Sequence, residues 1–205
     1  MLAGTLKKTH PRQGAQESAA ENMNDLQHDI ALMQRIADKD ESALQSLYAA
    51  CGQRIYAYAL RLTNDPALAE DVVQDTLVAI WRSAKKFRGD GRLIAWLLGI
   101  VHHTALKALR RKPALSLSPE MENTLPAHDP LPEETLEANE QTCLVRSALN
   151  QLSAEHRAVL ELVFYQGMSL NEAAAVCNCP VGTVKSRLSY ARKHLRGLLS
   201  RTEEI

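Results

Sequence analysis

Residues 168–195, MSLNEAAAVCNCPVGTVKSRLSYARKHL, decide the fold of this chain. Ser169 followed by Glu172 is a capping box, which predicts that a short helix begins at this point. A tight turn is expected at Asn178–Cys179, and a longer helix is expected over residues 180–199. A short helix, a tight turn and a longer helix have the spacing of a helix-turn-helix motif.

The longer helix has two unlike sides. One side is a continuous apolar seam that consists of Val181, Val184, Leu188, Ala191, Leu195 and Leu198. The other side is small or basic, with Gly182, Ser186, Ser189 and Lys193 at its centre and Thr183, Lys185, Tyr190, Arg192 and Arg196 beside them. Small residues let a backbone approach a DNA groove, and Ser, Lys and Arg bind base edges and phosphates. The pattern favours DNA binding over an ordinary charged surface helix.

Charge is segregated along the chain, although 24 bases balance 24 acids in its 205 residues. Residues 82–112 hold nine bases and one acid, residues 113–142 hold seven acids and no base, and residues 180–201 hold six bases and no acid. Because phosphate binding depends on local charge density, the two basic islands matter more than the net charge of zero.

Helical periodicity recurs through the chain, while the alternation typical of strands is nearly absent. We therefore predict an all-α protein with two small helical domains joined by an acidic, proline-rich linker. The expected domains are a disordered extension (1–24), a first helical domain (25–112), the flexible linker with five prolines (113–137) and a second helical domain (138–200). The expected helices are one that starts near Asp25, and others over 41–63, 66–86, 93–111, 135–150, 153–166, 169–177 and 180–199.

Other classes of protein find little support in the sequence. There is no phosphate-binding loop, nucleophile elbow or HExxH motif, so we expect no catalytic residue, no enzyme activity and no cofactor. His102 and His103 point about 100° apart on a helix and make a poor metal pair, so no metal site is expected. Sparse cysteines and the lack of a membrane-spanning run predict a cytoplasmic protein. A redox or metal role for Cys177 and Cys179 stays open.

Two surfaces of the first domain differ in kind. Around residues 81–112, the aromatic residues Trp81, Phe87 and Trp96 alternate with cations, which suits stacking of unpaired bases, although both Phe87 and Trp96 also fit a core role. The outward face of helix 66–86 carries acids around Val78, which suits contact with a protein rather than with DNA; a solvated face is the alternative.

Three stretches together resemble the extracytoplasmic-function (ECF) sigma factors, which are specificity subunits of bacterial RNA polymerase. They are AEDVVQDTLVAIW (69–81), FRGDGRLIAWLLGIVHHTALKALRRK (87–112) and LNQLSAEHRAVLELVFYQGMSLNEAAAVCNCPVGTVKSRLSYARKHL (149–195). The resemblance covers residues 25–112, which resemble region 2, and residues 140–199, which resemble region 4.

The resemblance implies partners and a role for each surface. The partners are the core polymerase (its β′ clamp helices and β flap), promoter DNA and an anti-sigma factor, and no membrane insertion is implied. The acidic linker resembles the segment that threads toward the RNA exit path. The implied core-binding residues are Asp71, Gln74, Asp75, Val78 and Trp81. The implied −10 DNA-binding residues are Phe87, Arg88, Arg92, Trp96, His103 and Lys107. The implied −35 DNA-binding residues are Thr183, Lys185, Ser186, Ser189, Tyr190, Arg192 and Lys193.

The chain also departs from the family pattern. Many relatives carry Asn where this chain has His103, and some carry a bulkier residue at Ser189, so neither promoter preference carries over. The first 24 residues have no counterpart. The alternative function is a one-component helix-turn-helix regulator that does not depend on core polymerase. It would need a sensor domain, and the N-terminal half shows no strand alternation of the receiver kind.

Overall fold

The protein is helical throughout the residues that its computed structural model describes, 11–111 and 147–200, which confirms the all-α prediction. The elements of the N-terminal half are α1 (Pro11–Ala37), α2 (Glu41–Thr63), α3 (Pro66–Ser83), the 3-10 turn η1 (Ala84–Lys86) and α4 (Leu93–Arg111). Those of the C-terminal half are α6 (Ala154–Leu160), the π-helical turn η2 (Glu161–Tyr165), α7 (Leu170–Val176) and α8 (Val181–Ser200). The predicted linker and most of the predicted helix 135–150 lie outside the described residues, and residues 147–150 are helical.

Local capping signals explain where the helices begin and end. Asp65 caps α3 and Pro66 follows at its first turn, while Asn64 closes α2 in the left-handed conformation (φ 52°). Ser169 and Glu172 form the predicted capping box of α7, with the Ser169 N–H 2.9 Å from Glu172 Oε2. The predicted bounds of α2 and α4 agree with the structure.

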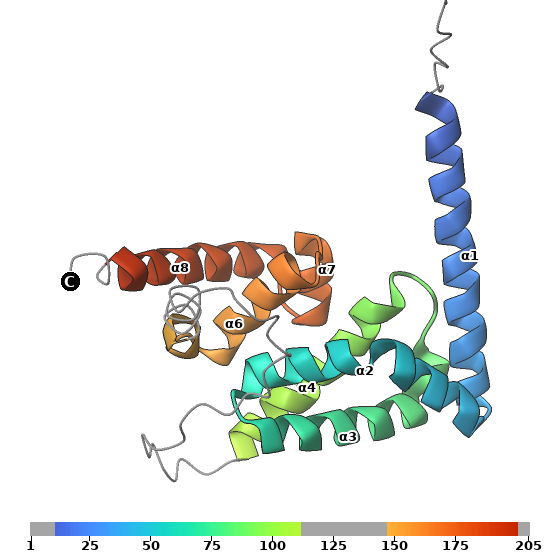
Figure 1. The fold of residues 1–205 in the computed structure, drawn as a ribbon, viewed down its shortest axis with the longest axis horizontal. Coiled ribbons are helices and arrows are strands. Elements are labelled where there is room, and N and C mark those ends of the chain that lie inside the picture. The colour runs from blue at the N-terminus through green and yellow to red at the C-terminus, as the bar shows by residue number, and fades with distance from the viewer. Residues whose placement is uncertain (1–10, 112–146, 201–205) are drawn as a thin grey trace, which may run out of the picture.

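Helix α1 begins much earlier than the sequence analysis predicts. It starts at Pro11 instead of near Asp25 and stands out from the other helices as a long rod (Figure 1). The interpretation of residues 1–24 as disordered is therefore wrong for residues 11–24. This stretch is rich in Ala, Gln and Glu, which form helices readily without an apolar seam, and the prediction relied on such a seam.

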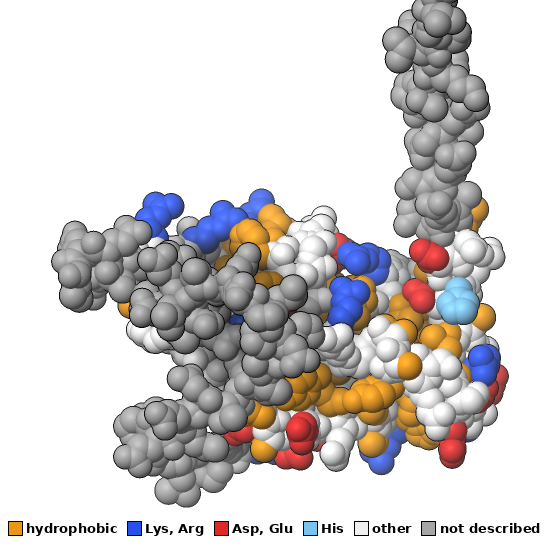
Figure 2. Space-filling model, in the orientation of Figure 1, with side chains coloured by type: hydrophobic (Ala, Val, Ile, Leu, Met, Phe, Trp, Pro, Cys, Tyr) orange, Lys and Arg blue, Asp and Glu red, His pale blue; other side chains and the backbone are white. Residues whose placement is uncertain are grey.

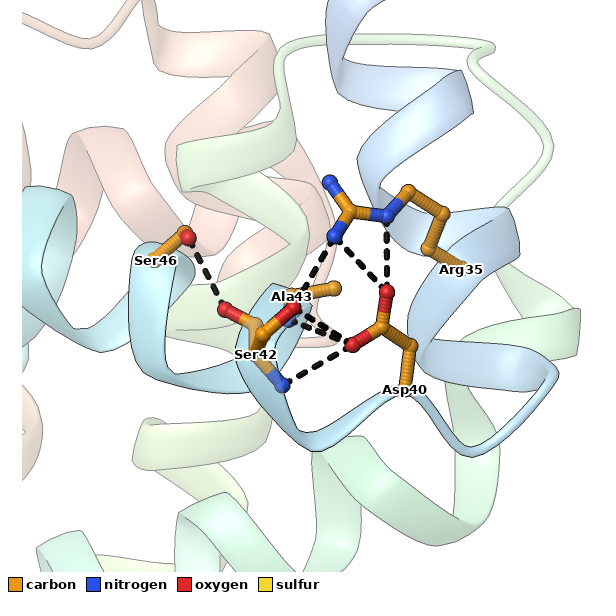
Figure 3. A network of polar contacts seen from close by, with 5 residues as sticks. All are labelled: Arg35, Asp40, Ser42, Ala43 and Ser46. Carbon is orange, nitrogen blue, oxygen red and sulfur yellow. Dashed lines mark hydrogen bonds and ion pairs between the residues drawn. The ribbon is translucent and has the colours of Figure 1, made fainter.

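A polar network fixes the corner between α1 and α2 (Figure 3). Asp40, the N-cap of α2, accepts hydrogen bonds from the N–H groups of Ser42 (2.9 Å) and Ala43 (3.2 Å), and its carboxylate also lies 2.7 Å from Arg35 Nη2. The hydrogen bond from the Ser42 side chain and the Arg35 guanidinium lower the pKa of Asp40 to about 2. Lys39 makes the turn itself with a left-handed backbone (φ 70°).

The core of the N-terminal half lies between α2, α3 and α4, which pack side by side (Figure 1). Its fully buried side chains include Leu47, Ile55, Ile80, Leu97 and Val101. In the C-terminal half, α8 packs on α6 and α7 through Val184, Leu188 and Ala191, which belong to the predicted seam and are all buried.

The two halves pack against each other, which the sequence did not predict. α2 contacts α6 and α4 contacts α7, so that one apolar core runs through both halves. Polar contacts border it: Arg54 donates to Gln166 Oε1 (2.9 Å), Arg157 donates to the Leu62 carbonyl (2.8 Å), and Arg61 Nε lies 3.7 Å from Glu161 Oε2. Burial raises the pKa of Glu161, and Arg61 opposes this shift.

His102 is the most deeply buried ionisable base of this core. It is 4% exposed, and its Nδ1 shares a 2.9 Å hydrogen bond with the hydroxyl of Tyr58, which is itself fully buried. Burial and, to a lesser extent, the positive charge of Arg187 on α8 lower the pKa of His102 from 6.5 to about 4. The imidazole is therefore neutral in the folded protein at neutral pH.

We expect the protein to lose stability as the pH falls from 6.5 toward 4. In this window the unfolded chain protonates His102 and the folded chain does not, so acid favours unfolding by up to roughly 3 kcal/mol. Urea unfolding at a series of pH values measures the slope. His102→Gln should flatten it, whereas His103→Gln, a change at the exposed neighbour, should not. Equal slopes in both variants would contradict a buried neutral His102.

Candidate nucleic-acid and protein interfaces

The outward side of α8 is exposed and basic. Gly182, Ser186, Ser189 and Lys193 all face solvent, as the predicted seam requires, and Figure 2 shows Lys and Arg side chains gathered along this helix. Of the predicted −35 residues, Thr183 alone is half-buried, while the rest are exposed: Lys185, Ser186, Ser189, Tyr190, Arg192 and Lys193. A groove of 630 Å³ runs beside them, bordered by Val163 and Leu170.

Several residues of α8 already have partners within the protein. Tyr190 packs against His156 with the rings tilted and their centroids 4.5 Å apart, and Arg192 lies 5.1 Å above the exposed ring of Phe164. These contacts hold both side chains against the body of the C-terminal half. Among the described residues, Lys185 and Lys193 have no ion-pair partner, so their charges are available to an outside ligand.

The turn of the helix-turn-helix has a plain structural role for Cys177. Asn178 adopts the left-handed conformation (φ 48°) that turns the chain between α7 and α8. Cys177 is 8% exposed, and burial raises the pKa of its thiol to about 12. The thiol of Cys177 therefore stays protonated and packs as a small apolar group.

The outward face of α3 carries acids around one apolar side chain. Asp71, Gln74 and Asp75 are exposed, and Val78 is 47% exposed in their midst. Trp81 lies half-buried at the edge, with Lys39 Nζ 4.7 Å from its ring centroid and 2.6 Å from its carbonyl oxygen. The acids repel phosphates, so this surface suits a protein partner better than DNA.

Cations and aromatic side chains come together at the start of α4. Phe87 and Trp96 meet edge to face, with ring centroids 5.7 Å apart, and each ring is half-buried against the core. Each ring can therefore pack on the core with one part and remain open to a stacking base with another. Arg88, Arg92, His103 and Lys107 are exposed nearby in sequence on the loop and on α4.

One of these cations is engaged by the C-terminal half. Arg92 Nη1 lies 3.7 Å from Glu172 Oε1, a residue of the α7 capping box. α7 and α4 also come close at Gly99. A Cβ added there would lie 4.0 Å from the Val176 Cα, which is van der Waals contact. Sequence reasoning missed Glu172 and Lys39 as partners of site residues, because each contact joins elements distant in sequence.

None of the described helices is both long enough and apolar enough to cross a membrane.

Comparison with known protein families finds a match in each half. Residues 47–113 match Sigma-70 region 2, and residues 144–195 match Sigma-70 region 4. Among curated proteins, the ECF RNA polymerase sigma factor SigL of Mycobacterium tuberculosis is 33% identical over 168 residues, which cover 82% of this chain and 94% of SigL. The RNA polymerase sigma-H factor of Pseudomonas aeruginosa is 30% identical over 176 residues, which cover 82% of this chain and 91% of that protein.

Two solved structures share the fold. CnrH, determined in complex with the cytosolic domain of CnrY, is 28% identical with a TM-score of 0.61, and the match covers 84% of this chain and 97% of CnrH. The sigma factor RpoE of Bartonella quintana, determined with the anti-sigma factor NepR, is 32% identical with a TM-score of 0.60, and the match covers 76% of this chain and 96% of RpoE.

Proposed function

The chain belongs to the ECF sigma factors of bacterial RNA polymerase, and from this premise we propose how its three exposed surfaces share the work of promoter recognition. The observation that supports the proposal best is that one compact helical body exposes an acidic-apolar face on α3, a cationic-aromatic surface at α4 and an acid-free basic face on α8. A protein partner, unpaired bases and duplex DNA, respectively, are the ligands that suit these surfaces.

Helix α8 is the reader of the upstream (−35) element. Its small residues Gly182, Ser186 and Ser189 let the backbone approach the floor of the major groove, where hydroxyl groups reach base edges. Lys185 and Lys193 bind phosphates on either side and set the register of the helix. Tyr190 and Arg192 are held by His156 and Phe164, so they meet DNA already ordered.

Helix α3 docks on the core enzyme. Val78 supplies a small apolar centre, and Asp71, Gln74 and Asp75 form the polar rim that a transient protein interface requires. Trp81 extends the apolar area, and Lys39 above its ring keeps it in place. By family resemblance, the partner surface is the pair of β′ clamp helices.

We expect Asp75→Lys to weaken binding to core polymerase by roughly tenfold, because it reverses a charge at the rim of the docking face. Titration of a labelled sample with core enzyme measures the affinity. Asp25→Lys is the matched control, since it makes the same charge change at an exposed position of α1, away from the outward face of α3. Equal loss in both variants would point to a general charge effect and contradict the docking face.

The loop of residues 88–92 and the start of α4 capture the melted −10 element. Arg88 is exposed and tracks the backbone of the strand, while the half-buried rings of Phe87 and Trp96 offer a surface to an unpaired base. Because these groups bind the unpaired strand and not the duplex, their binding energy shifts the promoter toward the open state.

The C-terminal half can bind the −35 element while the N-terminal half binds the −10 element only if the two halves separate. Elements near −35 and −10 lie about 25 base pairs apart, or about 85 Å at 3.4 Å per step. In the structure the halves instead share one core, and Glu172 holds the −10 residue Arg92. We infer that docking on the core enzyme, which gives each half a new partner surface, drives this separation.

Control by an anti-sigma factor follows from the same surfaces. CnrH and RpoE were each solved with a second protein, which for RpoE is the anti-sigma factor NepR. We propose that an anti-sigma factor binds this chain and covers its polymerase-docking face. The chain itself acts in the cytoplasm as a binding subunit without enzyme activity, and its chemistry is that of the polymerase.

Run-off transcription tests the proposal. Purified protein and core polymerase are incubated with genomic DNA fragments, and transcript 5′ ends are sequenced to reveal promoters. We expect discrete start sites that core enzyme alone does not produce. Tight duplex binding by the protein without core enzyme, and no added transcription with it, would favour the alternative of an independent helix-turn-helix regulator.

A further inference from the structure

The 88–92 loop lies against the side of α1. Gly89 has a left-handed backbone (φ 76°), and a Cβ built on it would lie 2.8 Å from Ile30 Cδ1, 3.1 Å from Ile30 Cγ1 and 3.4 Å from Leu26 Cδ1. Non-bonded carbon atoms prefer a separation of about 3.5–4.0 Å, so a side chain at Gly89 would displace the Ile30 side chain. The left-handed backbone favours glycine at this position, and any larger residue would also push against α1.

Helix α1 also contacts the end of the same loop. Burial raises the pKa of Asp29, which neighbours Ile30, and the backbone N–H of Leu93, the first residue of α4, opposes this shift by hydrogen bonding to the carboxylate. The first N–H groups of a helix have no acceptor within the helix, and a negative charge is stabilised at this end. Asp29 therefore gives α1 a second contact beside the loop, at the first turn of α4.

The position of α1 is itself fixed. Met33 (2% exposed) and Ile36 (0% exposed) are buried in the main core, and Arg35 ties the last turn to the N-cap of α2 (Figure 3). Leu26, Ile30 and Met33 follow one another at steps of four and three residues, so they form one face of α1. The contact with the core thus sets the rotation at which α1 meets the loop.

We propose that α1 is a positioning element for base capture: Leu26, Asp29 and Ile30 hold the 88–92 loop in the shape that receives an unpaired −10 base. These three residues act through the loop and do not touch DNA. The inference rests on the proposed function of the loop, and it adds that capture depends on the contacts of Leu26, Asp29 and Ile30 of α1 with the loop and the start of α4.

The test compares two probes on holoenzyme made with the full chain. One probe is a duplex fragment that carries the upstream element of a promoter found by transcript sequencing, and the other is a single-stranded oligonucleotide with the non-template −10 sequence of that promoter. For Ile30→Ala we expect binding of the oligonucleotide to weaken about fivefold to tenfold, while binding of the duplex changes by less than about twofold.

Leu32→Ala is the matched control. It removes an apolar side chain from the same helix, about 200° round from Ile30, where Leu32 packs on the main core. Thermal unfolding of both variants reports the loss of stability. We expect Leu32→Ala to lower the unfolding temperature at least as much as Ile30→Ala and yet to leave the ratio of the two affinities unchanged.

Two further comparisons examine the contacts themselves. Gly89→Ala should weaken oligonucleotide binding about tenfold in the natural background and clearly less in Ile30→Ala, which lacks the two nearest atoms. Asp29→Asn keeps an oxygen acceptor for the Leu93 N–H and should retain capture, whereas Asp29→Ala should lose it about fivefold.

The outcomes separate the inference from its premise. If natural holoenzyme does not bind the −10 oligonucleotide better than a scrambled one, the capture role of the loop is overturned and the inference falls with it. If natural holoenzyme does discriminate, but Ile30→Ala equals Leu32→Ala or Gly89→Ala is equally harmful in both backgrounds, the positioning role of α1 alone is overturned.

Discussion

Lys193→Glu is expected to reduce binding of holoenzyme to the upstream element by roughly 10- to 100-fold. Lys193 is exposed at the centre of the small, basic side of α8 and has no ion-pair partner among the described residues. Replacing its charge with a negative one would remove the proposed phosphate contact and add repulsion. Fewer counterions would then be released on binding. The slope of log affinity against log salt concentration should therefore also become shallower by about 1.

Lys86→Glu serves as the control for Lys193→Glu. It changes the net charge of the protein by the same amount at an exposed position of η1, in the other half of the chain. On a duplex fragment that holds only the upstream element, Lys86→Glu should bind as the natural protein does. Core binding should be equal in all three proteins, and a matching loss in both variants would mean that α8 is not the upstream reader.

Trp96→Ala is expected to reduce promoter opening about 5- to 150-fold, which corresponds to the 1–3 kcal/mol that stacking of one base on an aromatic ring provides. Binding of the closed duplex should fall little, since the proposed partner of Trp96 is an unpaired base. Permanganate reactivity of −10 thymines measures opening, and a filter-binding or mobility assay at low temperature measures the closed complex.

Trp96→Phe separates stacking from folding. Trp96 is half-buried and meets Phe87 edge to face, so the alanine variant also loses packing, which thermal unfolding will report. A phenylalanine keeps an aromatic ring at this position and should restore most of the opening. Equal reductions of closed-complex binding and of opening in Trp96→Ala would show that the ring serves the core alone.

Arg88→Ala provides a second route to the same conclusion without a change in packing. Arg88 is exposed on the loop, so its removal should leave the unfolding temperature unchanged. Opening should still fall more than closed-complex binding, because the guanidinium is proposed to act on the separated strand.

Local sequence patterns accounted for much of this structure. The steps of three and four between apolar residues predicted α2, α3 and α4, and the Asn64–Asp65–Pro66 signal correctly separated the first two. The predicted apolar seam of α8 was confirmed because α8 packs on α6 and α7 with one side only. Helix α1 was missed in part because its first turns carry no seam, and intrinsic helix propensity alone is a weak signal.

The sequence by itself determined the helical class, the caps and the chemical character of each outward face, since these depend on residues within one or two turns of each other. Only the tertiary structure decided which faces meet. It placed Glu172 on Arg92, Tyr58 on His102, and Ile30 against Gly89. Such contacts join distant segments, and they depend on the fit of whole surfaces through many weak dispersion interactions, which no local pattern records.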